Sequence, residues 1–501
     1  MKIEIQDIVS AVGGRLLGVV ESPVWITSIS IDTRTIVQGA LFVPLAGVQV
    51  DGHDFIKQAA ENGAICALTE RQNAPTDTGI PLIYVSSTRR ALMALADFYR
   101  RSHNVKVVAV TGSAGKTTTK DMIAEICAQK YKTKRTIGNF NNDIGMPLSI
   151  FRLEPDDEVL VLEMGMNHAG EIHELSLVGV PDIVVITHIG DAHIENFADR
   201  TGILHAKLEI VDGLRVGGTV VLNGNDPLLT GEIAAAKVSG FNVLYPSNEN
   251  IVSAVPMGLQ ETRCVFNWHG QEIPVTVPVP GGHMVMNALL ATVVGLQLGI
   301  TPAQITAAFE SFTPPEGRLN IFEASRENGE SAWASKFPEC EANKGRGYVT
   351  VIDDVYNANP TSMMEALKVL CREYGDAPET CTASGGAVQK RRRVAILGNM
   401  NELGQVAEAR HREVGEFAAT IGVDLLIAVG NLAYGINEGF YGATVGKDTG
   451  QIAMYFEHLE LFLPHIKEKL QDGDIVLVKA SRTMQFEKII EAITGYSKQQ
   501  N

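Results

Sequence analysis

The residues with the clearest chemistry lie in the stretch VAVTGSAGKTTTKDM, residues 108–122. An apolar run ends in glycines, and Lys116 and Thr117 then open a predicted helix. Backbone N–H groups of such a loop and the N-terminus of its helix can surround phosphate oxygens. Lys116 would place its charge on the β- and γ-phosphates, and the Thr117 hydroxyl could bind Mg²⁺. A strict Walker A motif has glycine where Val110 stands, so this is an abbreviated phosphate loop. The predicted nucleotide contacts are Thr111, Gly112, Ser113, Ala114, Gly115, Lys116, Thr117 and Thr118.

Polar side chains also follow the next two apolar runs. Glu163 comes directly after VLVL, at the edge where parallel strands present ligand sites, and we expect it to bind the metal. The run DIVVIT leads to a second group, namely His188, Asp191, His193 and Glu195. Within this group His193 is the predicted metal or phosphate contact. The alternative is a structural histidine that only makes hydrogen bonds.

The elements that must position these residues fall into three blocks. Residues 1–98 mix short strands and helices, which predicts a small α/β domain. Residues 99–314 alternate helical patterns with apolar runs, which are VKVVAV, EVLVLEM, DIVVITHI and GTVVLN. Such continuous runs are typical of strands buried on both faces of a parallel sheet. FTPPEGR, residues 312–318, is predicted to be a stiff linker, because Pro-Pro cannot continue a helix.

The third block, residues 315–501, resumes the alternation with YVTVIDDV, RVAILGN, DLLIAVG and DIVLVKAS. A second open α/β sheet is therefore predicted. Residues 324–347 and 375–393 are polar and lack periodicity, so we expect long surface loops there. The run Lys390–Arg393 is interpreted as a solvated loop flank.

Composition excludes several classes of protein. The 501 residues carry a net charge of −16, and a nucleic-acid partner would need a basic face. The six cysteines lack metal-binding spacing, which favours reduced thiols in the cytoplasm. The start, MKIEIQDIVSAVGG, does not have the pattern of a signal peptide, and no apolar run reaches the roughly 18 residues of a membrane span. We expect a soluble, cytoplasmic monomer that has no membrane span and no nucleic-acid partner.

Several of these segments together resemble the Mur ligase family. The phosphate loop, LEMGMNHAGEI, THIGDAHIENF and LNGNDP are similar to its central-domain motifs, and PGGHMVMNALLA (280–291) is similar to its ATP-side segment. The third block adds GR at 317–318, DDVYNANPTSM (353–363), LGNMNELG (397–404) and VKASRTM (478–484). YNANP is typical of the branch that adds a dipeptide, and the DNPR motif of the tripeptide-forming branch is missing. Asn399 and Ala480 depart from the family pattern, which has aspartate and glycine there.

The resemblance implies a fold and a reaction. It implies a UDP-sugar-binding N-terminal domain, a central P-loop ATPase domain and a Rossmann-like C-terminal domain. ATP would phosphorylate the terminal carboxylate of a UDP-N-acetylmuramoyl-tripeptide. The amine of D-alanyl-D-alanine would then attack the acyl phosphate, in the synthesis of a peptidoglycan precursor for the cell wall. Cations would dominate such a site, because two negatively charged reactants must meet.

The resemblance also implies the metal ligands. Thr117 and Glu163 would hold one Mg²⁺, and His193 a second, which Lys207 would support as a carbamate. From composition alone, Lys207 is instead a lysine whose stem packs on apolar surface while its ammonium reaches solvent.

The remaining site residues are likewise implied by the resemblance. The nucleotide would be contacted by Asn287, Arg318 and Asp354; the muramoyl-peptide by Asn139, Asn141 and Asn142; the uridine diphosphate by Ser28, Asp32, Thr33 and Arg34; and the dipeptide by Tyr356, Asn357 and Asn359. Simpler alternatives are an asparagine-rich turn in GNFNNDIG, a surface ion pair for Arg34 and a helix N-cap for Asn359. A binding module that uses ATP only as a switch, and a folate polyglutamate ligase, are the competing functions. Lysine or diaminopimelate at the third peptide position stays open.

Overall fold

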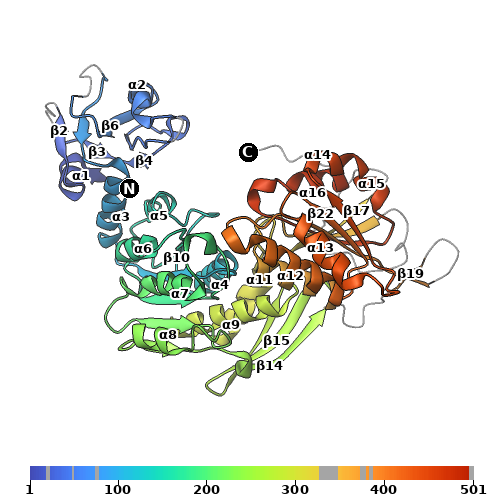
Figure 1. Cartoon of the computed structure of the whole chain (residues 1–501). Coiled ribbons are helices and arrows are strands. Elements are labelled where there is room, and N and C mark those ends of the chain that lie inside the picture. The colour runs from blue at the N-terminus through green and yellow to red at the C-terminus, as the bar shows by residue number, and fades with distance from the viewer. Residues whose placement is uncertain are drawn as a thin grey trace.

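A computed structural model describes residues 1–17, 23–47, 50–73, 78–325, 348–372, 380–382 and 388–495. The described residues form three larger sheets, which are called the first, central and third sheets in chain order. In Figure 1 the first sheet (blue) and the third sheet (orange to red) lie at opposite ends of the molecule, with the central sheet between them.

The first sheet has the spatial order β2 (Arg15–Leu17), β7 (Leu82–Tyr84), β6 (Ala64–Thr69), β5 (Ala40–Phe42) and β4 (Ser28–Ser30). Strands β1 (Ile3–Glu4) and β3 (Trp25–Ile26) pair beside it, and the helices are α1 (Ile5–Ala11), α2 (Ile56–Glu61) and α3 (Thr88–Arg101). Ser87 caps α3 by accepting a hydrogen bond from the Arg90 N–H. Leu92 and Leu95 of α3 are fully buried, and α3 also contacts helices beside the central sheet. This helix therefore joins the two sheets.

The central sheet is parallel throughout. Its order is β13 (Asn242–Leu244), β12 (Thr219–Leu222), β11 (Ile183–Ile186), β8 (Lys106–Thr111), β10 (Val159–Glu163) and β9 (Thr133–Arg135). The four predicted apolar runs are confirmed as the parallel strands β8, β10, β11 and β12. The helices of this part are α4 (Lys116–Ala128), α5 (Gly145–Ile150), α6 (Glu171–Gly179), α7 (Arg200–Leu208), α8 (Glu232–Lys237), α9 (Gly282–Gln297) and α10 (Pro302–Ser311). The carboxyl ends of the strands consequently share one edge, where ligands bind in open α/β sheets.

A small antiparallel sheet was not anticipated within the central block. It consists of β14 (Ile251–Met257), β15 (Glu261–Trp268) and β16 (Gln271–Val277). On β15 the buried residues alternate, with Thr262, Cys264, Phe266 and Trp268 inward, and this face packs against α9. Expecting strand–helix alternation throughout was wrong here, because half-exposed strands show period-two patterning in place of continuous apolar runs.

The predicted second open sheet is confirmed as the third sheet. Its order is β17 (Asn320–Ser325), β18 (Tyr348–Asp353), β24 (Ile475–Lys479), β21 (Arg393–Gly398), β22 (Leu425–Val429) and β23 (Ile452–Phe456). The edge strand β17 is antiparallel and the others are parallel. The helices are α11 (Pro360–Arg372), α12 (Ala407–Thr420), α13 (Tyr434–Thr444), α14 (Leu459–Phe462), α15 (Ile466–Lys469) and α16 (Glu487–Thr494).

The two polar stretches have different outcomes. Residues 326–347 of the first lie outside the described residues. In the second, β19 (Thr380–Thr382) and β20 (Val388–Lys390) pair antiparallel, and Arg391 and Arg392 are half-buried. Arg392 forms an ion pair of 2.7 Å with Asp474, which is 1 % exposed, and Arg391 donates to the Gly473 carbonyl. A solvated flank was therefore the wrong interpretation, because a buried carboxylate requires a charged partner.

The described residues bear on two predictions, the absence of a membrane span and the state of the cysteines. Within the described residues, no helix is both long and apolar enough to cross a membrane. Cys66, Cys127, Cys264 and Cys371 are buried cysteines, and burial raises the pKa of Cys66 to about 12. These thiols are consequently packing residues.

Candidate functional site

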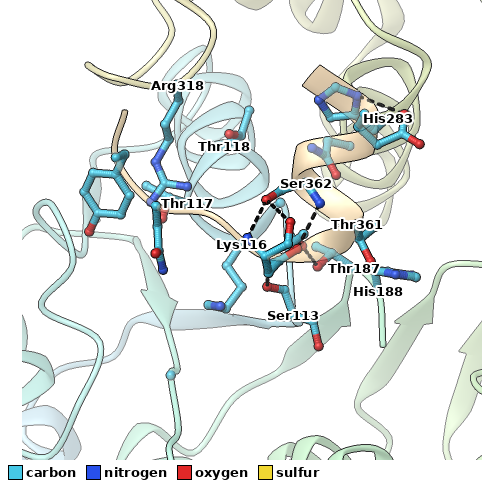
Figure 2. A pocket seen from close by; sticks show the side chains of 18 of the residues that line it. Ser113, Lys116, Thr117, Thr118, Thr187, His188, His283, Arg318, Thr361 and Ser362 are labelled. Atoms are coloured by element: carbon cyan, nitrogen blue, oxygen red, sulfur yellow. Dashed lines mark hydrogen bonds and ion pairs between the residues drawn. The ribbon is translucent and has the colours of Figure 1, made fainter. Parts of the chain in front are cut away.

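A cavity of about 470 Å³ opens at the carboxyl edge of the central sheet, where segments of the third sheet face it. In Figure 2, Lys116 and Thr117 of the phosphate loop stand opposite Thr361 and Ser362, which open helix α11. Sixteen of the predicted site residues line it: Ser113, Ala114, Gly115, Lys116, Thr117, Thr118, Asn139, Asn141, Glu163, His193, Asn287, Arg318, Asp354, Tyr356, Asn357 and Asn359. Segments far apart in the chain therefore meet at one site.

The phosphate loop owes its shape to two glycines. Gly112 and Gly115 have φ of +150° and +80°, and a Cβ on Gly112 would lie 1.9 Å from the Thr187 hydroxyl. Helix α4 begins at Lys116, and in the described part of the chain no side chain caps its N-terminus. Free N–H groups and the helix dipole thus face the cavity, as anion binding requires. Thr111 and Gly112, although predicted as nucleotide contacts, do not line the cavity. Thr111 is fully buried, and its hydroxyl donates to the Met164 carbonyl at 2.8 Å.

Lys116 is held close to the loop. Its ammonium donates to the Gly112 carbonyl at 2.8 Å. Burial lowers the pKa of Lys116, while the charge of Glu163 opposes this effect. A bound phosphate would give this ammonium the anionic partner that burial makes favourable.

Glu163 shows that the site suits a cation. The side chain is 1 % exposed, and its Oε1 accepts a hydrogen bond of 2.8 Å from the Asn141 amide. Its Oε2 is buried and has no hydrogen-bond partner among the described residues. A buried carboxylate oxygen without a partner is costly, and a cation removes that cost. No group of three or more His, Cys, Asp or Glu forms a ready-made metal site in the described ranges, so hydroxyl and phosphate oxygens would have to complete the shell.

The four residues after β11 do not form one cluster, because each has its own partner. His188 Nδ1 lies 2.8 Å from Asp226, and Asp191 is paired with Arg200. Glu195 contacts the third sheet through its backbone, since its N–H donates to the Glu402 carbonyl.

Of the four, His188 and His193 line the cavity. His193 Nδ1 lies 2.7 Å from Glu402 Oε2. Because its side chain lines the cavity, His193 remains a candidate to bind the metal or a phosphate.

Lys207 contradicts the expectation of an ammonium that reaches solvent. The residue is 1 % exposed and does not line the cavity. Its pKa is lowered well below the usual value, first by burial and then by the charge of Lys116. Its neighbours in α7, Ala206 and Leu208, are also buried, which leaves the stem no route to solvent.

The third sheet and the linker supply a second wall. Arg318 lies over the Tyr356 ring, 4.0 Å from its centroid. Asp354 forms an ion pair of 2.6 Å with Lys479, which is 2 % exposed. Asn287 of α9 completes this wall beside Gly115. The wall thus combines an aromatic–guanidinium stack with polar groups, which suits a nucleoside.

The asparagines divide between structural and cavity positions. Asn142 Oδ1 accepts from the Gly145 N–H at the start of α5, and the residue does not line the cavity. Asn359 caps α11 by accepting from the Ser362 N–H, and it lines the cavity as well. For Asn359 the cap and the ligand contact are compatible.

The predicted residues of the first sheet lie outside this cavity. Asp32 accepts from the Arg34 N–H and pairs with its guanidinium, which is 85 % exposed. Thr33 opens the same short turn, and the Ser28 hydroxyl is buried with no hydrogen-bond partner among the described residues. Any role for these four belongs to a part of the substrate remote from the phosphate loop.

Several cavity residues were not singled out from the sequence. They include Thr187, Asn223, His283, Thr361, Ser362, Glu365 and Lys479. His283 Nδ1 lies 3.4 Å from Glu365, and the pKa of Glu365 falls to about 2 because hydrogen bonds to His283 and Lys368 outweigh burial. All of these residues except Glu365 stand inside quoted motifs, so a motif alone did not indicate which of its residues line the cavity.

The departure at Asn399 has a structural explanation. Its Nδ2 donates to Asn431, and its Oδ1 accepts from the Ala433 N–H at 2.9 Å. Both ends of the amide are thus satisfied, and this position needs no charge. Ala480 is fully buried beside Gly398.

Fold and cavity together define an α/β protein with a phosphate loop and a cleft between sheets. Sequence comparison identifies three domains, each with its own match: "Mur ligase family, catalytic domain" at residues 25–100, "Mur ligase middle domain" at 110–295 and "Mur ligase, glutamate ligase domain" at 340–482. The chain belongs to the Mur ligase family.

Individual relatives and solved structures are similar to this chain over nearly its whole length. The UDP-N-acetylmuramoyl-tripeptide--D-alanyl-D-alanine ligase of Bacillus subtilis is 32 % identical over 98 % of both chains, and that of Escherichia coli is 30 % identical over 98 % of both. Among solved structures, MurF from Acinetobacter baumannii aligns with a TM-score of 0.82 and 28 % identity over 99 % of both chains. MurF ligase from Thermotoga maritima, solved in complex with ADP, aligns with a TM-score of 0.75 and 26 % identity, over 93 % of this chain and 97 % of that one.

Proposed function

We propose that this protein is an ATP-dependent ligase that joins D-alanyl-D-alanine to UDP-N-acetylmuramoyl-tripeptide through an acyl phosphate. The observation that carries the proposal is the buried Oε2 of Glu163, which has no hydrogen-bond partner in the described part of the chain and lies in a cavity that also contains Lys116 and His193. Similarity to dipeptide-adding ligases over nearly the whole chain supports the choice of substrates.

The chain's own residues account for the first step. The phosphate loop and the α4 N-terminus hold the β- and γ-phosphates, and Lys116 offsets their charge. Bound Mg²⁺ would supply further charge neutralisation between nucleotide and carboxylate, with Thr117, Glu163 and His193 as its protein ligands. The peptide carboxylate attacks the γ-phosphorus, and ADP leaves. Asn139 and Asn141 line the cavity, Asn141 donates to Glu163, and both asparagines would orient the peptide.

The second step joins the two peptides. The dipeptide amine attacks the acyl carbon, phosphate leaves, and one proton is released. Tyr356, Asn357 and Asn359 would receive the dipeptide, because they open from the third sheet onto the same cavity. Arg318, Asp354 and Asn287 would hold the nucleoside.

Carbamylation of Lys207 belongs to this proposal. A neutral amine attacks CO₂, the N–C bond forms, and a proton leaves. Burial and the charge of Lys116 lower the pKa of Lys207, which favours the neutral amine that this reaction needs. The carbamate would supply the negative charge that a ligand of a second Mg²⁺ needs, with His193 as the other protein ligand of that ion.

The domain assignment is also proposed. A UDP-sugar domain would span residues 1–98, an ATP-binding domain 99–314 and a C-terminal domain 315–501. The first boundary falls within α3, and the second falls between α10 and β17. Ser28, Asp32, Thr33 and Arg34 would meet the UDP end of the substrate, and we propose a cytoplasmic monomer.

The direct test is an amine-acceptor screen with mass detection. The protein is incubated with ATP, Mg²⁺, UDP-tripeptides carrying lysine or diaminopimelate, and D-alanyl-D-alanine. The account predicts a pentapeptide product and ADP in equal amounts. Product without ADP, or ATP hydrolysis that ignores the amine, would contradict it.

A matched pair of variants sharpens this test. Lys116→Ala removes the loop cation and should lower kcat/KM by at least about 100-fold, as loss of electrostatic stabilisation does. Lys106→Ala removes an exposed lysine at the other end of the same strand and should leave turnover unchanged. Equal activity in the two variants would mean that the loop is misassigned.

A further inference from the structure

Two close side-chain contacts connect the loop between β11 and α7 to segments beside the third sheet. It carries Asp191 and His193, and the partners from the other side are Arg410 of α12 and Glu402. Arg410 Nε lies 3.0 Å from Asp191 Oδ2, and His193 Nδ1 lies 2.7 Å from Glu402 Oε2. These four residues are called the clasp. Each of its two contacts joins the loop after β11 of the central sheet to a segment that follows β21 of the third sheet.

Asp191 is the buried centre of the clasp. Its carboxylate is fully shielded from solvent, and it binds Arg200 through both oxygens as well as Arg410. A buried carboxylate needs such partners, and the two arginines supply them from α7 and α12.

The second contact joins two residues with unusual backbone. His193 and Glu402 have φ of +62° and +64°, a region that non-glycine residues seldom occupy. The Glu195 N–H donates to the Glu402 carbonyl, so backbone as well as side chains meet here. Such conformations are energetically unfavourable and persist only where surrounding contacts hold them. The clasp supplies those contacts.

The clasp is also connected to two of the residues proposed to bind Mg²⁺, His193 and Lys207. Asp191 stands two residues before His193, and its partner Arg200 is the first residue of α7, the helix that carries Lys207. One carboxylate thus links the His193 loop, the Lys207 helix and the third sheet.

Resting on the proposed function, we infer that Arg410 and Glu402 are positioning residues, which fix His193 in its working place only when the third sheet is docked on the central one. Docking of the third sheet would in this way control the phosphoryl-transfer side of the cavity. Neither residue lines the cavity, so each acts through the loop and makes no substrate contact.

Arg410→Ala is a clean probe of this inference. Asp191 keeps its two contacts with Arg200, so the variant leaves no unpaired buried carboxylate. Arg412→Ala is the matched control, because Arg412 lies on the same helix and pairs with Glu438 of α13, away from the central sheet. Glu402→Gln tests the other half of the clasp.

Two readouts are measured on the full chain. The first is kcat and KM for each substrate. The second is hydrogen exchange of the 188–196 backbone amides with Mg²⁺ and a non-hydrolysable ATP analogue present. Arg410→Ala should lower kcat about 10- to 100-fold, a typical effect for residues that orient a ligand-bearing group, and should speed exchange in this loop. KM for the tripeptide should change less than about twofold, since uniform binding is untouched.

The controls decide the outcome. Arg412→Ala should match the parent protein in both readouts, and Arg410→Lys should recover part of kcat, because one charge returns. Arg410→Ala that behaves like Arg412→Ala, or that changes only one of the two readouts, would overturn the inference. A parent protein that forms no amide product would instead refute the proposed function, while the exchange readout would still test whether the clasp holds the loop.

Discussion

At the scale of single residues, the phosphate loop could be predicted because its chemistry is local. Its main residues lie close together in the sequence, so they are necessarily close in the structure; they are Gly112, Gly115, Lys116 and Thr117. Partners distant in the chain could not be predicted. The sequence does not show that Asp226 would pair with His188, or that a lysine between apolar residues would be sealed at 1 % exposure.

Lys207 offers a prediction at this scale. Lys207→Ala removes the amine that the proposal converts to a carbamate, and kcat should fall about 10- to 100-fold. Millimolar acetate should restore part of the rate, because it can supply the missing carboxylate. Chloride at equal ionic strength should restore nothing.

Lys237→Ala is the control for this experiment. Lys237 is exposed on α8 and pairs with Asp212, so its loss should leave kcat unchanged. In the parent protein, ¹³CO₂ should give a carbamate signal that Lys207→Ala abolishes. Full activity in Lys207→Ala would rule out a role for this residue.

At the scale of elements, the strands buried on both faces were predictable and the half-exposed ones were not. Strands β8, β10, β11 and β12 are continuous apolar runs, and all four are parallel neighbours. The antiparallel strands β15 and β16 alternate buried residues with more exposed ones, and β14 has no buried residue, which weakens the signal of all three in a sequence. The edges of the third sheet depend on pairing between distant segments, which local pattern does not encode.

The turn from β8 into α4 gives the prediction at this scale. Gly112→Ala should weaken nucleotide binding at least about tenfold and lower the unfolding midpoint, since overpacking costs about 1–3 kcal/mol. The cause is the 1.9 Å approach of the new Cβ to the Thr187 hydroxyl, which forces β11 and the loop apart.

Gly217→Ala isolates the clash from the backbone effect. Gly217 also has positive φ, +75°, but a Cβ there meets nothing within 4 Å. It should lower the midpoint slightly and leave nucleotide affinity intact. Calorimetry and titration with an ATP analogue measure both quantities, and equal loss of affinity in the two variants would contradict the steric argument.

At the scale of the whole molecule, the site exists because two sheets are docked. Apolar packing is continuous from Ile123 and Leu289 beside the central sheet to Leu367 and Ala418 beside the third. The cavity lies between these halves, while the first sheet stands apart from it (Figure 1). The order of motifs along the chain indicates that both halves contribute. It does not indicate which side chains meet, as Asp191 and Arg410 do.

The central claim is that the peptide carboxylate itself is phosphorylated in this cavity. It is tested most directly with a UDP-tripeptide labelled with ¹⁸O in its terminal carboxylate, incubated with ATP, Mg²⁺ and D-alanyl-D-alanine. The account predicts that each phosphate released carries one ¹⁸O atom, because the carboxylate oxygen stays with phosphorus when the amide forms. Phosphate without ¹⁸O, released together with amide product, would contradict it.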